Sequence, residues 1–221
     1  DNRGNKVVIP SIPSSGHKDV ISQQPDGGAK PQESGEAKII KNVKILPQSP
    51  VVSDTLKAEL LVDNDRGEVI NYKYLWIVNN KIVPDSDSET LKPGVFRKGD
   101  IVSVRVVPYK YGAEKVFSEA QPVLIQNSAP ALEMKSQPQK AGAVIEVQLA
   151  ASDADGDKVV FALEEPRLEG MMIDKETGKI TFAPKKIEKG VYKFKASTSD
   201  NSGGKTAREF EIKIEQETLK K

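Results

Sequence analysis

The chain of 221 residues contains no cysteine and a single histidine, His17. The lack of cysteine excludes disulfides, zinc sites built on thiolates and cysteine nucleophiles. One histidine cannot build a histidine-based metal site, and His17 lies in a polar stretch where a Ser-His-Asp triad has no credible setting. The chemistry left to this sequence therefore rests on carboxylates, lysines and hydroxyls.

Long apolar runs and an excess of charge are missing as well. No run reaches the roughly 18 apolar residues that a membrane-spanning helix needs, so the sequence predicts no membrane span. The 33 Lys and Arg residues nearly balance 32 Asp and Glu residues, so nothing draws the chain electrostatically to nucleic acid or to an acidic membrane. Aromatic residues make up only 5% of the chain, which favours two small domains with thin cores over one large domain.

The chain starts at Asp1, without an initiating Met. A cleaved export signal explains such a start, and trimming of the chain is the alternative. We therefore expect an extracytoplasmic location after signal cleavage: the cell surface, the medium or the periplasm.

Composition divides the chain into four segments. Residues 1–36 are rich in Pro, Gly, Ser and Gln and predict a flexible arm, because they cannot bury enough surface to offset the entropy of ordering. The alternative is a docking peptide that adds as a strand to a partner or to the chain's own domains. Residues 37–127 and 128–216 are predicted to be two domains joined at "NSAP", and residues 217–221 are predicted to be a frayed tail.

Both predicted domains show apolar residues at period two and no convincing helical period. In the first, "TLKAELLVD" and "IVSVRVVPYK" read as half-buried strands, and Asn79-Asn80 is expected to form a tight turn between two strands. In the second, five strands are expected, with turns at "DADGD", "DKETGK", "IEKG" and "DNSGG". The sequence therefore predicts an all-β chain.

The second predicted domain resembles the cadherin-like repeats, including the dystroglycan-type variant, of bacterial surface proteins. The resemblance is carried by "SDADGDKVVFAL", "LEGMMIDKETGKITFAP" and "KGVYKFKASTSDNSGG". It implies that Met172 or Ile173 points inward, that residues 174–178 reverse the chain, and that Ile180 and Phe182 return to the core.

The first predicted domain resembles immunoglobulin-like or fibronectin-type modules through "YKYLWIVNNKIV" and "GVFRKGDIVSVRVVP", with Trp76 in the central core position. Together the two resemblances imply tandem β-sandwiches and a role in extracytoplasmic scaffolding, adhesion or assembly. Neither implies catalysis.

One stretch, "DADGD", places Asp153, Asp155 and Asp157 on alternate positions around a glycine. Calcium takes six to eight oxygen ligands, and closely spaced carboxylates on a loop supply them. Asp200, in the turn before "NSGG", is a candidate for a further ligand. The alternative is a solvated acidic turn between two strands. An EF-hand is excluded, because Lys158 stands where that loop needs glycine and "KVVFAL" reads as a strand.

Weaker candidates have plainer alternatives as surface turns or packed side chains. Two further acidic loops are weak ligand candidates: Asp63, Asp65 and Glu68, and Asp85, Asp87 and Glu89. Paired carboxylates from Glu164, Glu165 or Glu169 could serve a glycosidase. Tyrosines on one strand face could stack on sugar rings, namely Tyr72, Tyr74, Tyr109 and Tyr111.

The sequence thus predicts a non-catalytic exported structural or interaction protein: an adhesin, a cell-envelope scaffold or an assembly subunit. Its expected partners are other protein subunits or cell-surface components, with self-assembly through the arm as one route. Calcium is the one cofactor considered. The alternative is a carbohydrate-binding or accessory module of a secreted system.

Overall fold

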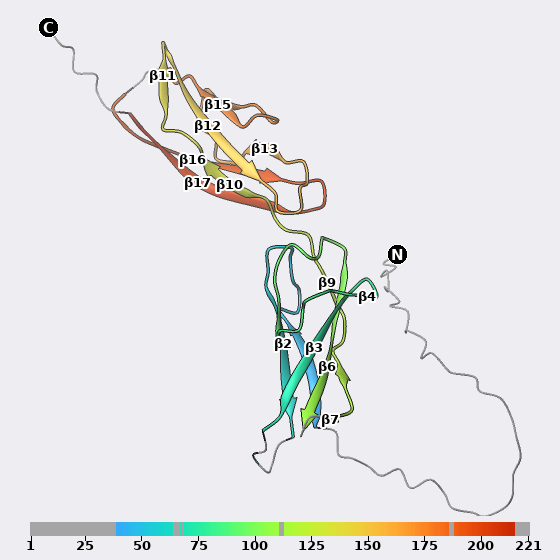
Figure 1. The fold of residues 1–221 in the computed structure, drawn as a ribbon. Coiled ribbons are helices and arrows are strands. Elements are labelled where there is room, and N and C mark those ends of the chain that lie inside the picture. The colour runs from blue at the N-terminus through green and yellow to red at the C-terminus, as the bar shows by residue number, and fades with distance from the viewer. Residues whose placement is uncertain (1–38, 64–66, 68, 111–112, 186–187, 215–221) are drawn as a thin grey trace, which may run out of the picture. The chain divides into compact units, whose positions relative to one another are not determined.

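The computed structural model describes residues 39–63, 67, 69–110, 113–185 and 188–214 (Figure 1). All of them belong to the second of two units into which the chain divides, residues 1–36 and 37–221. The predicted arm and the predicted tail lie outside the described residues. Every regular element in the described part is a β-strand, which confirms the all-β fold class. No described segment forms a helix that is long and apolar enough to cross a membrane.

The first sandwich consists of two facing sheets. One has the order β1-β2-β5, and the other has the order β4-β3-β6-β7, with β8 and β9 also pairing with β6. Its strands are β1 (Ile40–Leu46), β2 (Leu56–Val62), β3 (Asn71–Val78), β4 (Lys81–Ile82), β5 (Thr90–Leu91), β6 (Ile101–Lys110), β7 (Ala113–Glu114), β8 (Ser118–Glu119) and β9 (Val123–Leu124).

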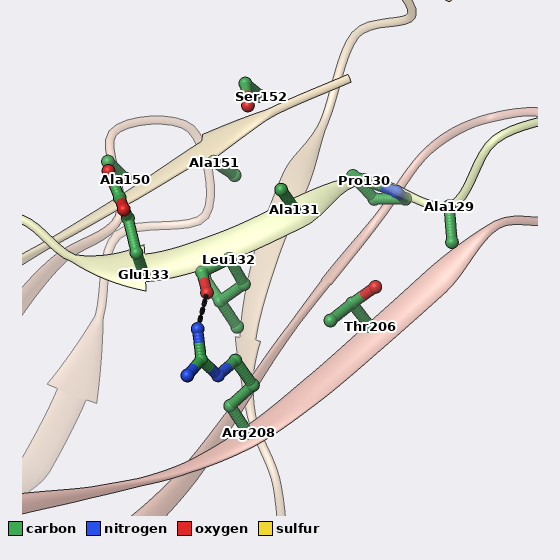
Figure 2. A pocket seen from close by; sticks show the side chains of 10 residues that line it. All are labelled: Ala129, Pro130, Ala131, Leu132, Glu133, Ala150, Ala151, Ser152, Thr206 and Arg208. Atoms are coloured by element: carbon green, nitrogen blue, oxygen red, sulfur yellow. Dashed lines mark hydrogen bonds between the residues drawn. The ribbon is translucent and has the colours of Figure 1, made fainter. Parts of the chain in front are cut away.

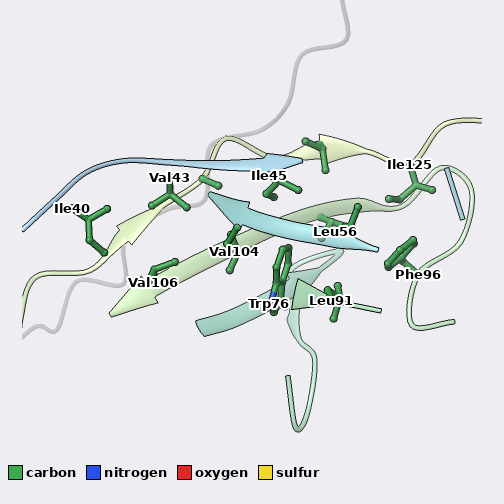
Figure 3. Packing of buried hydrophobic residues seen from close by; sticks show 14 residues of the cluster. Ile40, Val43, Ile45, Leu56, Trp76, Leu91, Phe96, Val104, Val106 and Ile125 are labelled. Carbon is green, nitrogen blue, oxygen red and sulfur yellow. The ribbon is translucent and has the colours of Figure 1, made fainter. Parts of the chain in front are cut away.

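Alternate side chains of these strands fill the space between the two sheets (Figure 3). On β6, Val102, Val104 and Val106 are fully buried, as a strand with one face on the core requires. Trp76 on β3 is also fully buried, and its indole Nε1 donates a hydrogen bond to the Ser88 carbonyl at 3.0 Å. The predicted core position of Trp76 is confirmed.

The turn between β3 and β4 is formed by Asn79 and Asn80. Both have positive φ, 50° and 65°, which is the signature of a two-residue hairpin turn and which Asn tolerates better than most residues. The Asn79 side chain also exchanges hydrogen bonds with the 100–101 segment, donating to Asp100 and accepting from the Ile101 amide. The predicted tight turn is confirmed.

The second sandwich has eight strands where five were predicted. One sheet has the order β10-β12-β15-β14, with β11 also on β12, and the other has the order β13-β16-β17. The strands are β10 (Ala131–Met134), β11 (Gln139–Ala141), β12 (Val144–Ser152), β13 (Val160–Leu163), β14 (Met171–Ile173), β15 (Lys179–Phe182), β16 (Gly190–Ser199) and β17 (Lys205–Ile214).

The core of the second sandwich includes Ile180 and Phe182, as predicted. Of the two residues named as alternatives on β14, Ile173 packs against this core, whereas Met172 is 66% exposed. Met171, which the prediction passed over, is buried instead. Neighbours along a strand face opposite sides, so burying Met171 turns Met172 to solvent.

The chain reverses between β14 and β15 around Asp174. Its Oδ1 accepts the backbone N–H groups of Glu176 and Thr177 at 2.9 and 2.8 Å, and the Gly178 amide donates to the Asp174 carbonyl. Gly178 has a φ of 70°, and a methyl group there would come within 2.9 Å of the Phe161 ring. The predicted turn at residues 174–178 is confirmed, and Gly178 is required by both conformation and space.

Replacing Ile180 by Ala should destabilise the second sandwich by about 2–5 kcal/mol, because the buried side chain leaves a cavity. The chain has a single tryptophan, so Trp76 fluorescence reports only on the first sandwich. In urea unfolding of Ile180→Ala, the urea midpoint measured by Trp76 fluorescence should stay unchanged. The part of the circular-dichroism transition that comes from the second sandwich should move to a lower urea concentration. The free energy of unfolding of Met172→Ala, a change at an exposed position, should stay within about 0.5 kcal/mol of that of the wild type. A shift of both signals together would show that the two sandwiches unfold as one unit.

Asp174 should also make stability depend on pH. Hydrogen bonds from Thr177, first, and from the Glu176 amide lower the pKa of the Asp174 carboxyl. Its contribution is therefore fully present above the unfolded-state pKa of about 3.9 and is lost as the pH falls through the folded-state pKa. The stability difference between the wild type and Asp174→Asn, measured by urea unfolding at falling pH, should shrink below about pH 4. A difference that is constant with pH would contradict this.

Candidate functional site

The acidic loop, residues 153–157, connects β12 to the segment before β13. The Asp153 side chain organises it: Oδ1 accepts the backbone N–H groups of Asp155 and Asp157, at 2.9 and 3.1 Å. Gly156 supplies the left-handed conformation that closes the turn, with a φ of 82°, and its amide donates to the Asp153 carbonyl. The loop thus has a defined backbone.

This backbone brings the three predicted carboxylates together. One carboxylate oxygen from each of Asp153, Asp155 and Asp157 lies within 4.8 Å of the other two, and all three residues are partly buried. No other group of three such residues gathers in this way within the described part of the chain. Like charges so close repel one another, so the arrangement favours a bound cation or positively polarised neighbours.

The neighbours come from the linker and from the first sandwich. The Ser128 amide donates to Asp155 Oδ2 at 2.6 Å. The Lys98 ammonium forms a short ion pair with Asp157 Oδ2, and it also donates to Asn127 Oδ1 at 3.1 Å and to Ser202 Oγ at 2.9 Å. Side-chain hydrogen bonds to Asp157, first from Lys98 and then from Ser202, lower the pKa of Asp157, and the bond to Asp157 raises the pKa of Lys98.

The fourth predicted residue, Asp200, stands next to this group but outside the set of three. Its Oδ1 accepts the amides of Ser202 and Gly204 at 2.7 and 2.8 Å, and its Oδ2 accepts the Asn127 side-chain amide at 2.9 Å. The Asn127 bond is the first cause of the lowered pKa of Asp200. Asp200 is therefore connected to the acidic loop indirectly, through Asn127 and then Lys98.

Some carboxylate oxygens of the acidic loop have no hydrogen-bond partner in the described part of the chain. Asp153 Oδ2 and Asp155 Oδ1 are buried and have no hydrogen-bond partner among the described residues, and the same holds for Ser128 Oγ. Buried carboxylate oxygens without a partner are costly, so such atoms call for an explanation. An oxygen-seeking cation is one chemistry that would use them.

The other candidate residues do not converge within the described part of the chain. Asp63 pairs with Lys41 at 2.9 Å, while Asp65 and Glu68 lie outside the described residues. Glu164 pairs with Lys205 at 2.7 Å at the end of a strand, which agrees with the exclusion of an EF-hand. Three further candidates pair with separate cations: Glu89 with Lys57, Glu165 with Arg167 and Glu169 with Lys185. Asp85 and Asp87 are exposed.

The tyrosines of β3 are partly buried and pack against the core of the first sandwich. Burial raises the pKa of both Tyr72 and Tyr74. Tyr109 donates to Glu114 at 2.7 Å, and Tyr111 lies outside the described residues. The strand-face tyrosines therefore behave as packed side chains, and the carbohydrate-binding interpretation stays a prediction.

A groove of about 460 Å³ runs along the start of the second sandwich, between β10 and β17 (Figure 2). Its walls are small and polar side chains, including Ala131, Ser152 and Thr206, and Arg208 closes it by donating to the Leu132 carbonyl at 2.8 Å. It holds no aromatic side chain and a single carboxylate, Glu133, so it offers neither a sugar platform nor a carboxylate pair.

Residues 125–215 match the model of the family described as "Putative Ig domain". This stretch of the chain is similar to that family. The match spans β10–β17 and contains the acidic loop, Asn127 and Asp200. With the first sandwich before it, the chain carries two β-sandwiches in tandem, and the family match agrees with the predicted resemblance to Ig-like and cadherin-like modules.

Solved structures with a similar fold have low identity to this chain. The chicken interferon gamma receptor alpha chain is 12% identical, with a TM-score of 0.44, over 79% of this chain and 97% of that one. Fibronectin(III)-like modules of Clostridium thermocellum CbhA are 14% identical, with a TM-score of 0.30, over 81% and 97%. The human desmocollin-1 ectodomain is 13% identical, with a TM-score of 0.36, over 82% of this chain and only 39% of its own. No curated protein matches the chain significantly.

Sequence reasoning missed Lys98, Ser128 and Ser202 as members of the site. Lys98 lies in "GVFRKGD", which reads only as a turn, and its partner Asp157 is 59 residues away. No spacing rule links a turn of one sandwich to a loop of the next.

Gly204→Ala should disrupt the site by crowding it. A methyl group at Gly204 would overlap Asp200 Oδ2 and come within 2.9 Å of both Asn127 Nδ2 and the Ser128 carbonyl. Overpacking of this kind costs about 1–3 kcal/mol, which a lowered melting temperature should show. Gly190→Ala is the matched control, because the nearest atom there is 3.9 Å away. Equal melting temperatures for the two variants would contradict the crowding.

Proposed function

We propose that this chain is a non-catalytic exported module that holds interaction surfaces at a fixed spacing, in an adhesive, envelope-scaffold or assembly role. Ig-like and cadherin-like domains are typically extracellular, mediate protein interactions and lack catalytic activity, which supports the proposal. The observation that carries it is the polar cluster where the linker meets both sandwiches. A linker tied by side chains on either side favours a fixed spacing over free rotation.

The proposal includes the domain division: residues 37–127 and 128–216 as two domains, with residues 1–36 and 217–221 as an arm and a tail. Separate cores support the division, one around Trp76 and one around Ile180. The partners we propose are other protein subunits or cell-surface components. Self-assembly through the arm remains a prediction that concerns residues outside the described part.

We also propose calcium as the ligand of the acidic loop. Asp153, Asp155 and Asp157 would hold the ion. Asp200 would act on the site indirectly, through its hydrogen bond with Asn127. Two features of the residues fit this ion: all the candidate ligands are oxygen atoms, and two buried carboxylate oxygens lack partners. When bound, calcium would supply charge neutralisation and oxygen coordination, not a reaction.

Calorimetric titration of calcium into chelator-treated protein tests this. Binding should raise the unfolding free energy by about 2.7 kcal/mol when free calcium is 100-fold above its dissociation constant. Asp155→Asn and Asp157→Asn should each abolish the heat of binding, because each removes a charged ligand. Asp87→Asn, in an exposed loop of the first sandwich, is the control and should bind as the wild type does. If no calcium-dependent heat or stabilisation appears in any protein, the acidic loop is a turn, and calcium drops out of the proposed function.

A further inference from the structure

A cation already stands against the acidic loop: the ammonium of Lys98. An ammonium group has three N–H donors, and in Lys98 all three find acceptors, on Asp157, Asn127 and Ser202. The three acceptors come from the acidic loop, the linker and the loop after β16. One side chain of the first sandwich thus joins three segments around the site.

The backbone holds Lys98 in this position. The turn from Phe96 to Asp100 is anchored by the buried Phe96 ring, and Asp100 Oδ2 accepts the Arg97 amide at 2.7 Å. Hydrogen bonds of 2.9 Å in both directions, from the Gly99 amide to the Ile125 carbonyl and from the Ile125 amide to the Asp100 carbonyl, tie the turn to the end of the first sandwich. The Lys98 side chain is 29% exposed, so it is held against the loop and not extended into solvent.

Lys98 leaves part of the site unused. Its ammonium contacts a single oxygen of the acidic loop, on Asp157, while Asp153 Oδ2 and Asp155 Oδ1 have no partner in the described part of the chain. Ser128, whose amide donates to Asp155, is only 6% exposed, and its buried hydroxyl also lacks a partner among the described residues. A point charge with three donors cannot serve all these oxygens, whereas a divalent cation with six to eight ligands can.

We infer that Lys98 is the resident cation of the acidic loop, and that calcium binds there only when the Lys98 ammonium withdraws from Asp157. The inference rests on the calcium site proposed above and adds its regulation. Two cations that share Asp157 Oδ2 would stand a few ångströms apart and repel each other. Binding therefore exchanges the side-chain bridge from Lys98 for a metal, and it frees the first sandwich from Asp157.

Removing the competitor should tighten calcium binding. If Lys98 occupies the loop in about nine molecules of ten, the apparent affinity of the wild type is lowered about tenfold. Titration calorimetry should then show Lys98→Met binding calcium about tenfold more tightly than the wild type. Lys92→Met, in the same loop and exposed, is the matched control and should match the wild type. Circular dichroism checks that both variants fold.

The outcomes separate the two proposals. Equal affinities for wild type and Lys98→Met would overturn the competition and leave the calcium site standing. Absence of binding in both would overturn the site and the competition together. Tighter binding in Lys92→Met as well would show a general charge effect and would also overturn the specific role of Lys98.

A second readout uses the wild-type chain alone. Lysine acetylation by a limiting amount of an activated ester, mapped by mass spectrometry, should be slow at Lys98 in chelator, because three acceptors hold its nitrogen and the side chain is only 29% exposed. Adding calcium should release Lys98 and raise its acetylation several-fold, while Lys92 stays unchanged. If Lys98 and Lys92 react at the same rate in chelator, Lys98 is not the resident cation.

Discussion

Each sandwich is held together by apolar side chains packed between its two sheets, because the chain has no cysteine with which to cross-link them. This constraint requires strict alternation on the long strands, since one misplaced residue would turn a core side chain to solvent. It also makes the few large core residues important. Trp76 is the largest fully buried side chain, and its Nε1 bond to Ser88 satisfies its one polar atom.

The packing places the loops that form the polar cluster. The acidic loop follows β12 and the Asp200 turn follows β16, strands from different sheets of the second sandwich. Both strands are fixed by the core between them, and hydrogen bonds from Ser128 to Asp155 and from Asn127 to Asp200 hold the two loops against the linker. The cluster contains the carboxylates of the acidic loop and Asp200, faced by one ammonium, so its net charge is negative. A cluster with a net negative charge attracts cations, whether the cation is an ammonium group or a metal ion.

The sequence allowed the long strands to be predicted because period-two alternation is a local signal. The Asn79-Asn80 turn was predicted from its turn-forming residues, whereas the core position of Trp76 and the 174–178 turn came from the resemblance to known domains. The short strands β10, β11 and β14 were missed, since three or four residues give too little alternation to read. The prediction left Met172 and Ile173 open as the inward residue because "MMI" offers two phases, and the structure selects Ile173, in phase with the buried Met171. The acidic triplet was visible, but Lys98 was not, because its contact depends on tertiary structure.

Lys98 meets Asp157 across 59 residues and Ser202 across 104. During synthesis from the N-terminus, the first sandwich is complete long before the loop after β16 exists. Lys98 therefore gains its last acceptor, Ser202, only when most of the second sandwich has been made. The polar cluster is completed by residues from near the end of the chain, although Lys98 belongs to the first sandwich.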